Sequence, residues 1–512
     1  MMKRAAFPAA LALMVALSVA LSAQTASAAD YATALEAARH GDRAALAALI
    51  QKRVDVNKAD GDGSTALHWA SYRDDYEAVD MLLRAGAKVN ATTDLGATAL
   101  WTASQNGGER IVKRLLDAGA DPNIALVSGE TSTMVAARGG YAGVIELLAA
   151  KGANVNAHGT RGQTALMWAA SQQHPAAVKA LLAHGADVHA KSDVWSEVMA
   201  VPPHGYPEYN KSIPHGGETA LMFAARVGDA ESAKLLVAGG SNVNDTDAWG
   251  VSATALAAHS NFTDVVELLL DKGADPSAAK AGFSALHLAI MHRNERMAIA
   301  LLNHGANPND PIKTWTPSRR SAKDLNLAPE LVGATPLWLA ARFLEPGVMR
   351  LLIEKGADPL FVHHGEYVAE AGKREDGFPH RTHVTTPLMA AMGMGGGDGW
   401  APIPAGQKEA LTLEAAKIAM VPGVDVNVKD SDGKTALDGA RSLRFQSVVD
   451  LLVEHGATGA AAGGARGAGG PGGARGAGAG RGAGPGRGAG PGRGAGPGTA
   501  AGPGGARGAG GQ

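Results

Sequence analysis

Apolar and small residues recur at helical spacing over residues 162–190, which read GQTALMWAASQQHPAAVKALLAHGADVHA. The apolar positions are Leu166, Ala169 and Ala170 in a first predicted helix and Val178, Leu181 and Leu182 in a second. Thr164 is placed to cap the first helix with its hydroxyl, and Pro175 suits the first position of the second because it has no N–H to donate. Gly185 follows as the stop. The pattern predicts helix, turn, helix and an extended finger loop in about 33 residues.

The same pattern is repeated along most of the chain. Glycines open successive units at Gly63, Gly96, Gly129, Gly162, Gly217, Gly250, Gly282, Gly333 and Gly433. Closing glycines stand at Gly86, Gly119, Gly152, Gly185, Gly240, Gly273, Gly305, Gly356, Gly423 and Gly456. A repeat of this period is typical of a solenoid, in which each unit buries its apolar face only against its neighbours.

Two stretches carry a family resemblance. Residues 335–341, TPLWLAA, and residues 284–289, SALHLA, are similar to the Thr-Pro-Leu-His-x-Ala motif of ankyrin repeats. The resemblance covers residues 29–458 in about eleven units. It implies an all-α repeat solenoid of helix-turn-helix pairs joined by β-hairpin or finger loops. It also implies that His68 and His287, at the motif's histidine position, hydrogen-bond the backbone of neighbouring fingers.

Four insertions break the period, near residues 191–216, 310–332, 361–385 and 392–408. They are rich in aromatic residues: Trp195, Tyr206, Tyr209, Trp315, Phe361, Tyr367, Phe378 and Trp400. Disordered spacers avoid aromatic residues, so these insertions are expected to fold back on the array or to present anchor side chains to a partner.

The first 28 residues have the layout of a secretory signal peptide. Lys3 and Arg4 precede an apolar run over residues 9–21, and Ala26-Ser27-Ala28 supplies a small-residue cleavage site, with Ala23 as the alternative. A short membrane anchor is the competing interpretation, but the run is too short to span a bilayer comfortably. We therefore expect export, with the periplasm as destination and release from the cell as the alternative, and no membrane span in the mature chain.

Charge is segregated along the chain. The formal net charge is −2, yet the first 28 residues carry two basic residues and the tail carries six arginines, neither with an acid. The repeat body therefore carries about −10, which disfavours nucleic-acid binding. The tail, residues 459–512, consists almost entirely of Gly, Ala, Pro and Arg and is predicted to be disordered. We interpret it as a solvated spacer or, alternatively, as an electrostatic tether to acidic envelope components.

No catalytic motif is recognisable, and no cofactor or catalytic residue is predicted. The absence of cysteine excludes thiol nucleophiles and thiolate metal sites. The strongest metal candidates are the histidines of the third insertion, His363, His364, His380 and His383, since imidazoles in one loop suit zinc. His380 and His383 would meet on a helix at this spacing. The competing interpretation, solvated loop histidines, is the more common one, so no metal site is assigned.

The predicted function is protein binding by an exported scaffold, with a partner of unknown identity. In ankyrin proteins the fingers and the first helices form a concave groove, and the residues after each Ala-Ala pair commonly face the partner. The resemblance assigns this role to Tyr72, Arg73, Gln105, Asn106, Arg138, Ser171, Gln172, Arg226, His259, Met291, His292, Arg342 and Phe343. Anchor side chains are added by Trp195, Tyr206, Tyr209, Trp315, Tyr367 and Trp400 of the insertions. Tyrosine, tryptophan and arginine suit such a surface because they bury much area and keep a polar group.

Overall fold

The computed structural model describes residues 31–199, 211–316, 327–368 and 380–459 of the 512-residue chain. The expected signal peptide, residues 1–28, and the tail from residue 460 onward lie outside these ranges. Tyr206, Tyr209 and Phe378 of the aromatic insertions also lie outside them.

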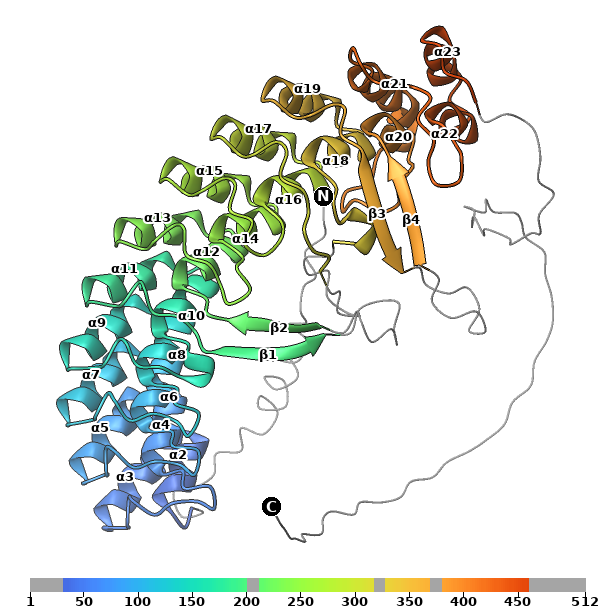
Figure 1. The fold of residues 1–512 in the computed structure, drawn as a ribbon. Coiled ribbons are helices and arrows are strands. Elements are labelled where there is room, and N and C mark those ends of the chain that lie inside the picture. Colours follow the sequence, from blue (N-terminus) through green and yellow to red (C-terminus); the bar gives the residue numbers. More distant parts are fainter. Residues whose placement is uncertain (1–30, 200–210, 317–326, 369–379, 460–512) are drawn as a thin grey trace, which may run out of the picture. The chain divides into compact units, whose positions relative to one another are not determined.

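The described residues contain eleven consecutive helix pairs, which follow one another along the chain in Figure 1. The first helices of the pairs are α2 (Ala34–His40), α4 (Ala66–Tyr72), α6 (Ala99–Asn106), α8 (Ser132–Arg138), α10 (Ala165–Ser171), α12 (Ala220–Val227), α14 (Ala253–His259), α16 (Ala285–Met291), α18 (Pro336–Arg342), α20 (Pro387–Ala391) and α22 (Ala436–Leu443). The second helices are α3 (Arg43–Gln51), α5 (Tyr76–Arg84), α7 (Glu109–Asp117), α9 (Ala142–Ala150), α11 (Pro175–Ala183), α13 (Ala230–Ala238), α15 (Thr263–Asp271), α17 (Glu295–Asn303), α19 (Pro346–Glu354), α21 (Lys408–Ala419) and α23 (Gln446–Glu454).

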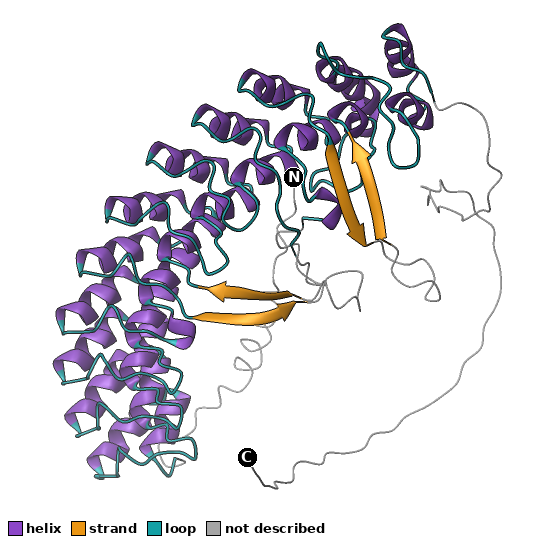
Figure 2. Ribbon diagram, in the orientation of Figure 1, coloured by secondary structure: helices purple, strands orange, loops and turns teal. Residues whose placement is uncertain are grey.

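The helices stack in two layers. Each first helix contacts the first helix of the next pair, and each second helix contacts the next second helix; Figure 2 shows the loops that join them. Close approach depends on small side chains such as Ala169 and Ala170, both with no exposed surface. The predicted fold class, an all-α ankyrin-type solenoid, is confirmed.

The local signals at residues 162–190 act as predicted. The Thr164 hydroxyl accepts a hydrogen bond from the Met167 backbone N–H at the start of α10, and Pro175 is the first residue of α11. Gly185 has φ of +79°, a conformation that glycine adopts without the steric cost of a Cβ atom. The unit boundaries therefore follow directly from residue type.

Asparagine side chains connect one finger loop to the next. Asn123 Nδ2 donates to the carbonyl of Gly152 at 3.0 Å, and Asn123 Oδ1 accepts from the N–H of Asn154 at 2.7 Å. The same pair of bonds recurs at Asn57, Asn90, Asn156, Asn244, Asn309 and Asn427. Each of these bridges satisfies a carbonyl at the end of a second helix, where no intrahelical donor is available.

All four insertions contain short regular elements. Strands β1 (Val194–Met199) and β2 (Lys211–Gly216) form one antiparallel hairpin, and β3 (His363–Val368) and β4 (His380–Thr385) form another. A short 3-10 turn, η3 (Pro329–Leu331), precedes α18, and η4 (Ala405–Gln407) precedes α21; η1 (Thr160–Gly162) lies in a regular finger. The fourth insertion joins the two helices of one pair, α20 and α21.

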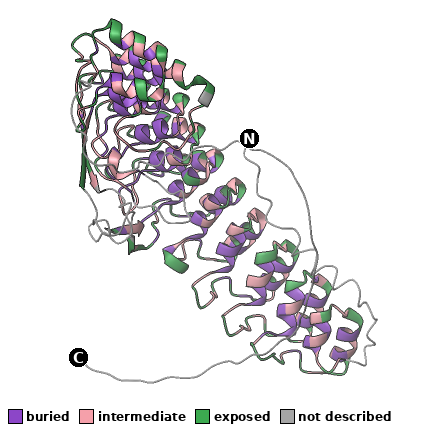
Figure 3. Ribbon diagram, turned by 90° about the vertical axis from the view of Figure 1, so that its right-hand side faces the viewer, coloured by how far each residue is buried: buried purple, intermediate pink, exposed green. Residues whose placement is uncertain are grey.

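Buried residues run along the whole stack, as the colouring of the helix pairs in Figure 3 shows. Leu67, Leu100 and Leu166 occupy equivalent positions in α4, α6 and α10, and each is 1% exposed. His68 and His287 are buried and hydrogen-bond the carbonyls of Ala97 and Asp310 at 2.9 and 2.8 Å. The expectation that these histidines bond the backbone of neighbouring fingers is confirmed.

Candidate functional site

The most accessible set of expected contact residues lies on one side of α4, α6, α8, α10 and α12. We call this side the open face and define it by Tyr72, Gln105, Arg138, Ser171 and Arg226. Tyr72 is 60% exposed, Gln105 and Arg226 are exposed, and Arg138 and Ser171 are half-buried. The structure therefore leaves these side chains accessible, as a contact surface requires.

Half-buried aromatic rings lie one turn earlier on the same helices. Trp69 of α4, Trp168 of α10 and Phe223 of α12 are partly exposed and pack on the core. The Tyr72 ring meets the Trp69 ring edge-on, with centroids 5.9 Å apart. Aromatic side chains with one buried and one accessible side offer large contact area at low entropy cost.

Arginines of the open face are held by acids from the finger loops. Arg138 pairs with Glu130 and Arg226 pairs with Glu218. Their guanidinium groups also lie over rings, Arg138 at 5.4 Å from Trp168 and Arg226 at 5.9 Å from Phe223.

Arg39 repeats this arrangement at the start of the array, where it pairs with Asp60 and lies 4.7 Å from the Trp69 ring. We call these three arrangements the arginine clamps. An arginine fixed by both an acid and a ring loses less side-chain freedom on binding than a free one does.

Burial affects the acid of the α12 clamp. It raises the pKa of the Glu218 carboxyl, while the neighbouring Arg226 charge acts in the opposite direction and Asp247 acts in the same one. The finger acid is therefore a desolvated partner rather than a surface charge. Desolvated pairs are screened less by salt than exposed pairs.

Polar side chains link neighbouring units beside Tyr72. Arg73 donates to the Arg39 carbonyl at 3.2 Å, and Asn106 Nδ2 donates to the Tyr72 carbonyl at 2.7 Å. Ser171 donates to the Trp168 carbonyl at 2.9 Å, and its neighbour Gln172 is exposed. Arg73 and Asn106 thus support the face through the backbone as well as presenting polar atoms.

For two of the expected contact residues, the assignment to the contact surface is wrong. Met291 has no exposed surface and Phe343 is 3% exposed, so neither can meet a partner in this conformation. The cause is a segment of the fourth insertion, residues 393–407, which we call the strap. It lies along α14, α16 and α18, where Gly399 packs against Phe343 and the Trp400 N–H donates to the Met291 carbonyl at 2.9 Å.

The strap also contacts three other expected residues. The Trp400 ring lies edge-on to His259 and His292, with centroids 5.4 and 4.8 Å away. Arg342 donates to the carbonyls of Gly396 and Gly397 at 3.0 and 2.8 Å. Trp400 therefore anchors a segment of its own chain.

Trp195 of the first hairpin contacts two side chains, a guanidinium group and an imidazole ring. The Arg161 guanidinium lies 4.4 Å from the Trp195 ring, and the His215 ring stacks on it at 5.6 Å. Val194 and Val198 of β1 are 61% and 70% exposed. Strand β1 thus presents exposed valines along its length, while Trp195 itself is half-buried.

Trp315 of the second insertion is half-buried. Tyr367 of β3 is also half-buried, and its ring lies 5.8 Å from that of His383. Burial raises the pKa of the Tyr367 hydroxyl, and the nearby Glu330 charge adds to the effect. Both side chains remain partly accessible to a partner.

The histidines of the third insertion do not gather as a metal site requires. His380 and His383 lie on β4, where side chains alternate, so they project to opposite sides instead of meeting on one side of a helix. His383 faces His363 across the hairpin, Nε2 to Nδ1 at 3.1 Å, and His363 also bonds the Val332 carbonyl at 2.9 Å. Burial lowers the pKa of His363 and lowers that of His383 to about 4, the latter also by the His363 charge.

Among the described residues no group of three or more His, Cys, Asp or Glu side chains is placed to hold a metal ion. Within the same ranges no helix is both long and apolar enough to cross a bilayer. These two findings concern residues 31–199, 211–316, 327–368 and 380–459 alone.

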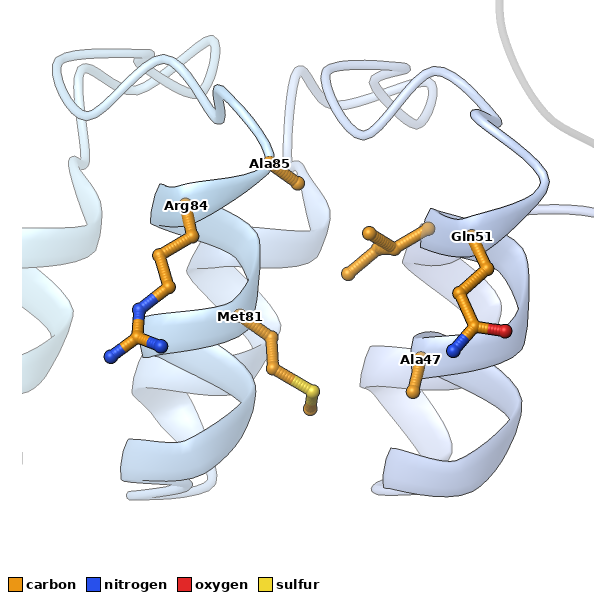
Figure 4. Close-up of a pocket in the computed structure, with 6 residues that line it drawn as sticks. Ala47, Gln51, Met81, Arg84 and Ala85 are labelled. Atoms are coloured by element: carbon orange, nitrogen blue, oxygen red, sulfur yellow. The ribbon is translucent and has the colours of Figure 1, made fainter.

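The second-helix layer carries shallow depressions. One of about 300 Å³ lies between α3 and α5 and is lined by Ala47, Ile50, Gln51, Met81, Arg84 and Ala85 (Figure 4). Another, of about 500 Å³, lies between α15 and α17 beside Glu267 and Arg296. Both are open to solvent and lack the enclosed polar groups of an enzyme site.

Sequence reasoning missed the rings and acids of the arginine clamps. Trp168 precedes Ser171 by three residues, a spacing that places both on one side of a helix. That signal could have added Trp69, Trp168 and Phe223 to the expected surface. Glu130 and Glu218 immediately precede the capping threonines, and nothing local indicates that they reach an arginine eight residues later.

Comparison with known proteins agrees with this architecture. The family model described as "Ankyrin repeats (3 copies)" matches residues 34–125, 100–192 and 221–312. The models "Ankyrin repeats (many copies)" and "Ankyrin repeat" match residues 166–237 and 332–364.

An ankyrin repeat-containing protein of Treponema pallidum (strain Nichols) is 37% identical over 94 residues, which are 18% of this chain and 32% of that protein. The chain thus spans about a third of this curated relative. The human ASB11 ankyrin repeat domain, a crystal structure, is 29% identical, with 47% of this chain and 98% of that chain covered and a TM-score of 0.39.

Proposed function

Because the chain belongs to the ankyrin-repeat family, we propose that it is an exported scaffold that binds another protein through the open face and the finger loops. Ankyrin repeats generally mediate protein–protein interaction and are typically non-enzymatic. The observation that carries the finer proposal is the series of arginine clamps. They place arginine and aromatic side chains together, in a fixed arrangement, on the accessible side of the first helices.

The physical basis of binding is pre-organisation. Each clamp arginine already has an acid and a ring, and the helices beneath it are buried. A partner therefore orders few new groups on binding, and modest contacts from several units add up. Since the clamp acids are occupied by arginine, we expect the partner to supply backbone carbonyls or carboxylates to the remaining guanidinium N–H groups.

The test is a triple variant, Tyr72→Ala, Arg138→Ala and Arg226→Ala, compared with the parent chain in capture from bacterial envelope extract. We expect loss of the specifically retained protein. A matched control replaces Arg84, Arg110 and Arg296 of the second-helix layer with alanine and should retain it. Equal retention by the triple variant and the parent would contradict binding at the open face.

Export is proposed from the layout of residues 1–28, with a bacterial periplasm as destination and release from the cell as the alternative. The intact mass of the cell-expressed chain measures it directly. We expect a mature chain beginning at Ala29, or at Gln24 if cleavage follows Ala23, in the osmotic-shock fraction. A full-length mass, or recovery with the cytoplasmic fraction alone, would contradict export.

A metal-dependent function of the third insertion is not proposed. The hairpin brings together His363 and His383, and these two rings hydrogen-bond each other. Among the residues that the structure describes, no third ligand joins this pair, and two histidines alone form a weak site for a divalent ion. The paired rings, the nearby Trp338 and the Thr385 hydroxyl instead form a packed junction between hairpin and array.

A further inference from the structure

The strap, residues 393–407, has the contacts of a bound peptide. From residue 393 to residue 404 it forms no helix or strand, and most of its residues are half-buried or exposed. It lies on α14, α16 and α18. Its contact with Arg293 joins residues 109 positions apart in sequence, and its contact with Arg342 joins residues 54 positions apart. The strap follows α20 in the chain, and it therefore covers helices that are distant from it in sequence.

Recognition of the strap uses its main chain. Arg342 Nε and Nη2 donate to the carbonyls of Gly396 and Gly397, and Arg293 Nη1 donates to the Pro402 carbonyl at 3.2 Å. In the other direction, the Trp400 N–H donates to the Met291 carbonyl. Main-chain contacts of this kind fit any extended segment of suitable shape.

One side chain gives the contact its specificity. The Trp400 indole lies against the rings of His259 and His292, which come from α14 and from the residue after α16. His292 Nε2 in turn bonds the His259 carbonyl at 2.6 Å, so the two units that form this aromatic contact are fixed to each other. An aromatic anchor between two rings is a common centre of binding energy.

Glycine is required in the strap for two separate reasons. Gly395 has φ of +95°, and a Cβ atom there would stand 2.6 Å from the Trp338 ring. Gly397 has φ of +70° and would bring a Cβ against the Leu331 side chain. The chain passes so close to the array that side chains at these positions would push it away.

The helices under the strap are more apolar than the open face. At the position of Trp69, Trp168 and Phe223, the covered helices carry Leu256, Leu288 and Leu339, which are 4%, 0% and 0% exposed. These leucines stand where three of the five open-face helices have half-buried rings; α6 has Thr102 and α8 has Val135 there. The two halves of the first-helix layer are thus different surfaces, and one of them already has an occupant.

We propose that the face of α14, α16 and α18 is a binding site for an extended glycine- and proline-rich polypeptide with one tryptophan, and that the strap occupies this site in cis. A partner segment of the same chemistry displaces the strap and takes over its contacts with Arg342 and the His259–His292 pair. The strap is suited to exchange because its apolar contacts are few, chiefly Met394, Trp400 and Ile403. This site is separate from the open face and does not depend on the partner proposed there.

The test uses a fluorescent synthetic peptide of residues 394–404, MGGGDGWAPIP, added to the purified chain. A tethered strap competes at an effective concentration in the millimolar range, so the parent chain should bind the peptide weakly. Trp400→Ala weakens the strap and leaves its site intact, and we expect it to bind the peptide at least about tenfold more tightly. Adding Arg342→Ala to this variant should abolish that gain.

The matched control adds Arg226→Ala to Trp400→Ala, because Arg226 has the equivalent position on α12 under no strap. This variant should keep the gain. A peptide with the tryptophan replaced by alanine should bind no variant. Folded Trp400→Ala that binds the peptide no better than the parent would overturn the proposal, as would a gain that survives Arg342→Ala.

Hydrogen exchange on the parent chain decides the matter if Trp400→Ala fails to fold. At millimolar peptide the Trp400 amide should exchange faster while α14, α16 and α18 stay protected. An unchanged Trp400 amide would overturn the proposal. Peptide binding confined to a dimeric form would assign the site to the strap of a second copy and would also overturn occupation in cis.

Discussion

At the residue scale, the helix-pair pattern determines which positions are buried. It does not determine whether every buried polar atom has a hydrogen-bond partner. Thr254 of α14 stands at the position of Leu166, as does Thr133 of α8. Both are buried, at 2% and 1% exposure, and neither hydroxyl has a hydrogen-bond partner. A buried unpaired hydroxyl lowers the free energy of unfolding relative to an apolar group of the same shape.

Thr254→Val and Thr133→Val are therefore expected to stabilise the array by about 1 kcal/mol each, since valine keeps the shape and removes the unpaired hydroxyl. Urea unfolding followed by circular dichroism measures the change. Thr102→Val is the control, because the Thr102 hydroxyl donates to the Thr98 carbonyl at 3.1 Å and its loss brings no benefit. If all three variants shift the midpoint alike, the unpaired hydroxyls are not the cause.

A second buried group makes stability depend on pH. Glu345, the residue before α19, is 7% exposed, and its Oε1 has no hydrogen-bond partner. Burial raises the pKa of its carboxyl from 4.5 to about 8, while the Arg293 charge opposes the shift and Glu295 reinforces it. The folded chain therefore favours the protonated carboxyl.

The pKa of Glu345 is higher in the folded chain than in the unfolded chain. The contribution of the protonated carboxyl to the free energy of unfolding is therefore fully present below pH 4.5 and is lost as the pH rises toward 8. We expect Glu345→Gln to leave stability at pH 4.5 nearly unchanged and to raise it at pH 8 by on the order of 2–4 kcal/mol. Melting curves across this range measure it. Glu354→Gln, at the exposed end of α19, should keep the pH dependence of the parent; a parallel profile for Glu345→Gln would contradict the assignment.

At the element scale, the repeat period carries most of the prediction. The period predicted α10 and α11 from Gly162 to Ala190, and both occur there. The period also led to the wrong prediction that Met291 and Phe343 lie on the contact surface, because each follows the same motif as Tyr72. Their burial depends on the strap, whose path is determined by contacts with Arg293 and Arg342 far away in sequence. No local pattern in a glycine-rich insertion indicates such a path.

The third insertion shows the same limit. Nothing in residues 361–385 predicts strand pairing, because the register His363↔Thr385 is set where the hairpin meets Trp338 and Val332. The sequence therefore indicated four histidines in one loop and left their partners open. Strand alternation then separates them into two pairs.

The asparagine bridges supply a prediction for the junctions between units. Asn123→Ala removes two hydrogen bonds that join consecutive finger loops and should lower the free energy of unfolding by about 1 kcal/mol, because these bonds are partly exposed. Asn303→Ala, at the exposed end of α17, is the control. Native-state hydrogen exchange should show faster exchange near residues 150–156 in Asn123→Ala. Unchanged exchange there would mean that helix packing alone holds the junction.

At the scale of the whole molecule, the stack divides its first helices into two surfaces. Helices α4 to α12 present rings and clamped arginines, and helices α14 to α18 present leucines under the strap. Since each unit contacts chiefly its neighbours, the two surfaces can change independently. One array can thus combine a permanently accessible surface with one that its own chain covers.

The tail supplies the last prediction. In the alternative interpretation of the tail, its six arginines, without any acid, attach the chain to acidic envelope components by charge alone. The variant that tests this is a chain truncated after Gly459. This end point keeps Thr458, whose N–H donates to Asn427 Oδ1 at 2.6 Å and completes the last asparagine bridge. The shortened chain should then sediment with anionic vesicles far less than the parent at 20 mM salt, and the two should differ little at 500 mM, where charge is screened within a few ångströms.

A full-length chain with the six tail arginines changed to lysine separates charge from arginine chemistry. If charge alone acts, this variant should sediment like the parent, and a variant with six glutamines should behave like the shortened chain. Neutral vesicles should retain none of the four proteins. Equal sedimentation of the parent and the shortened chain at low salt would leave the tail as a spacer, and binding by the array itself would then have to account for any association with the envelope.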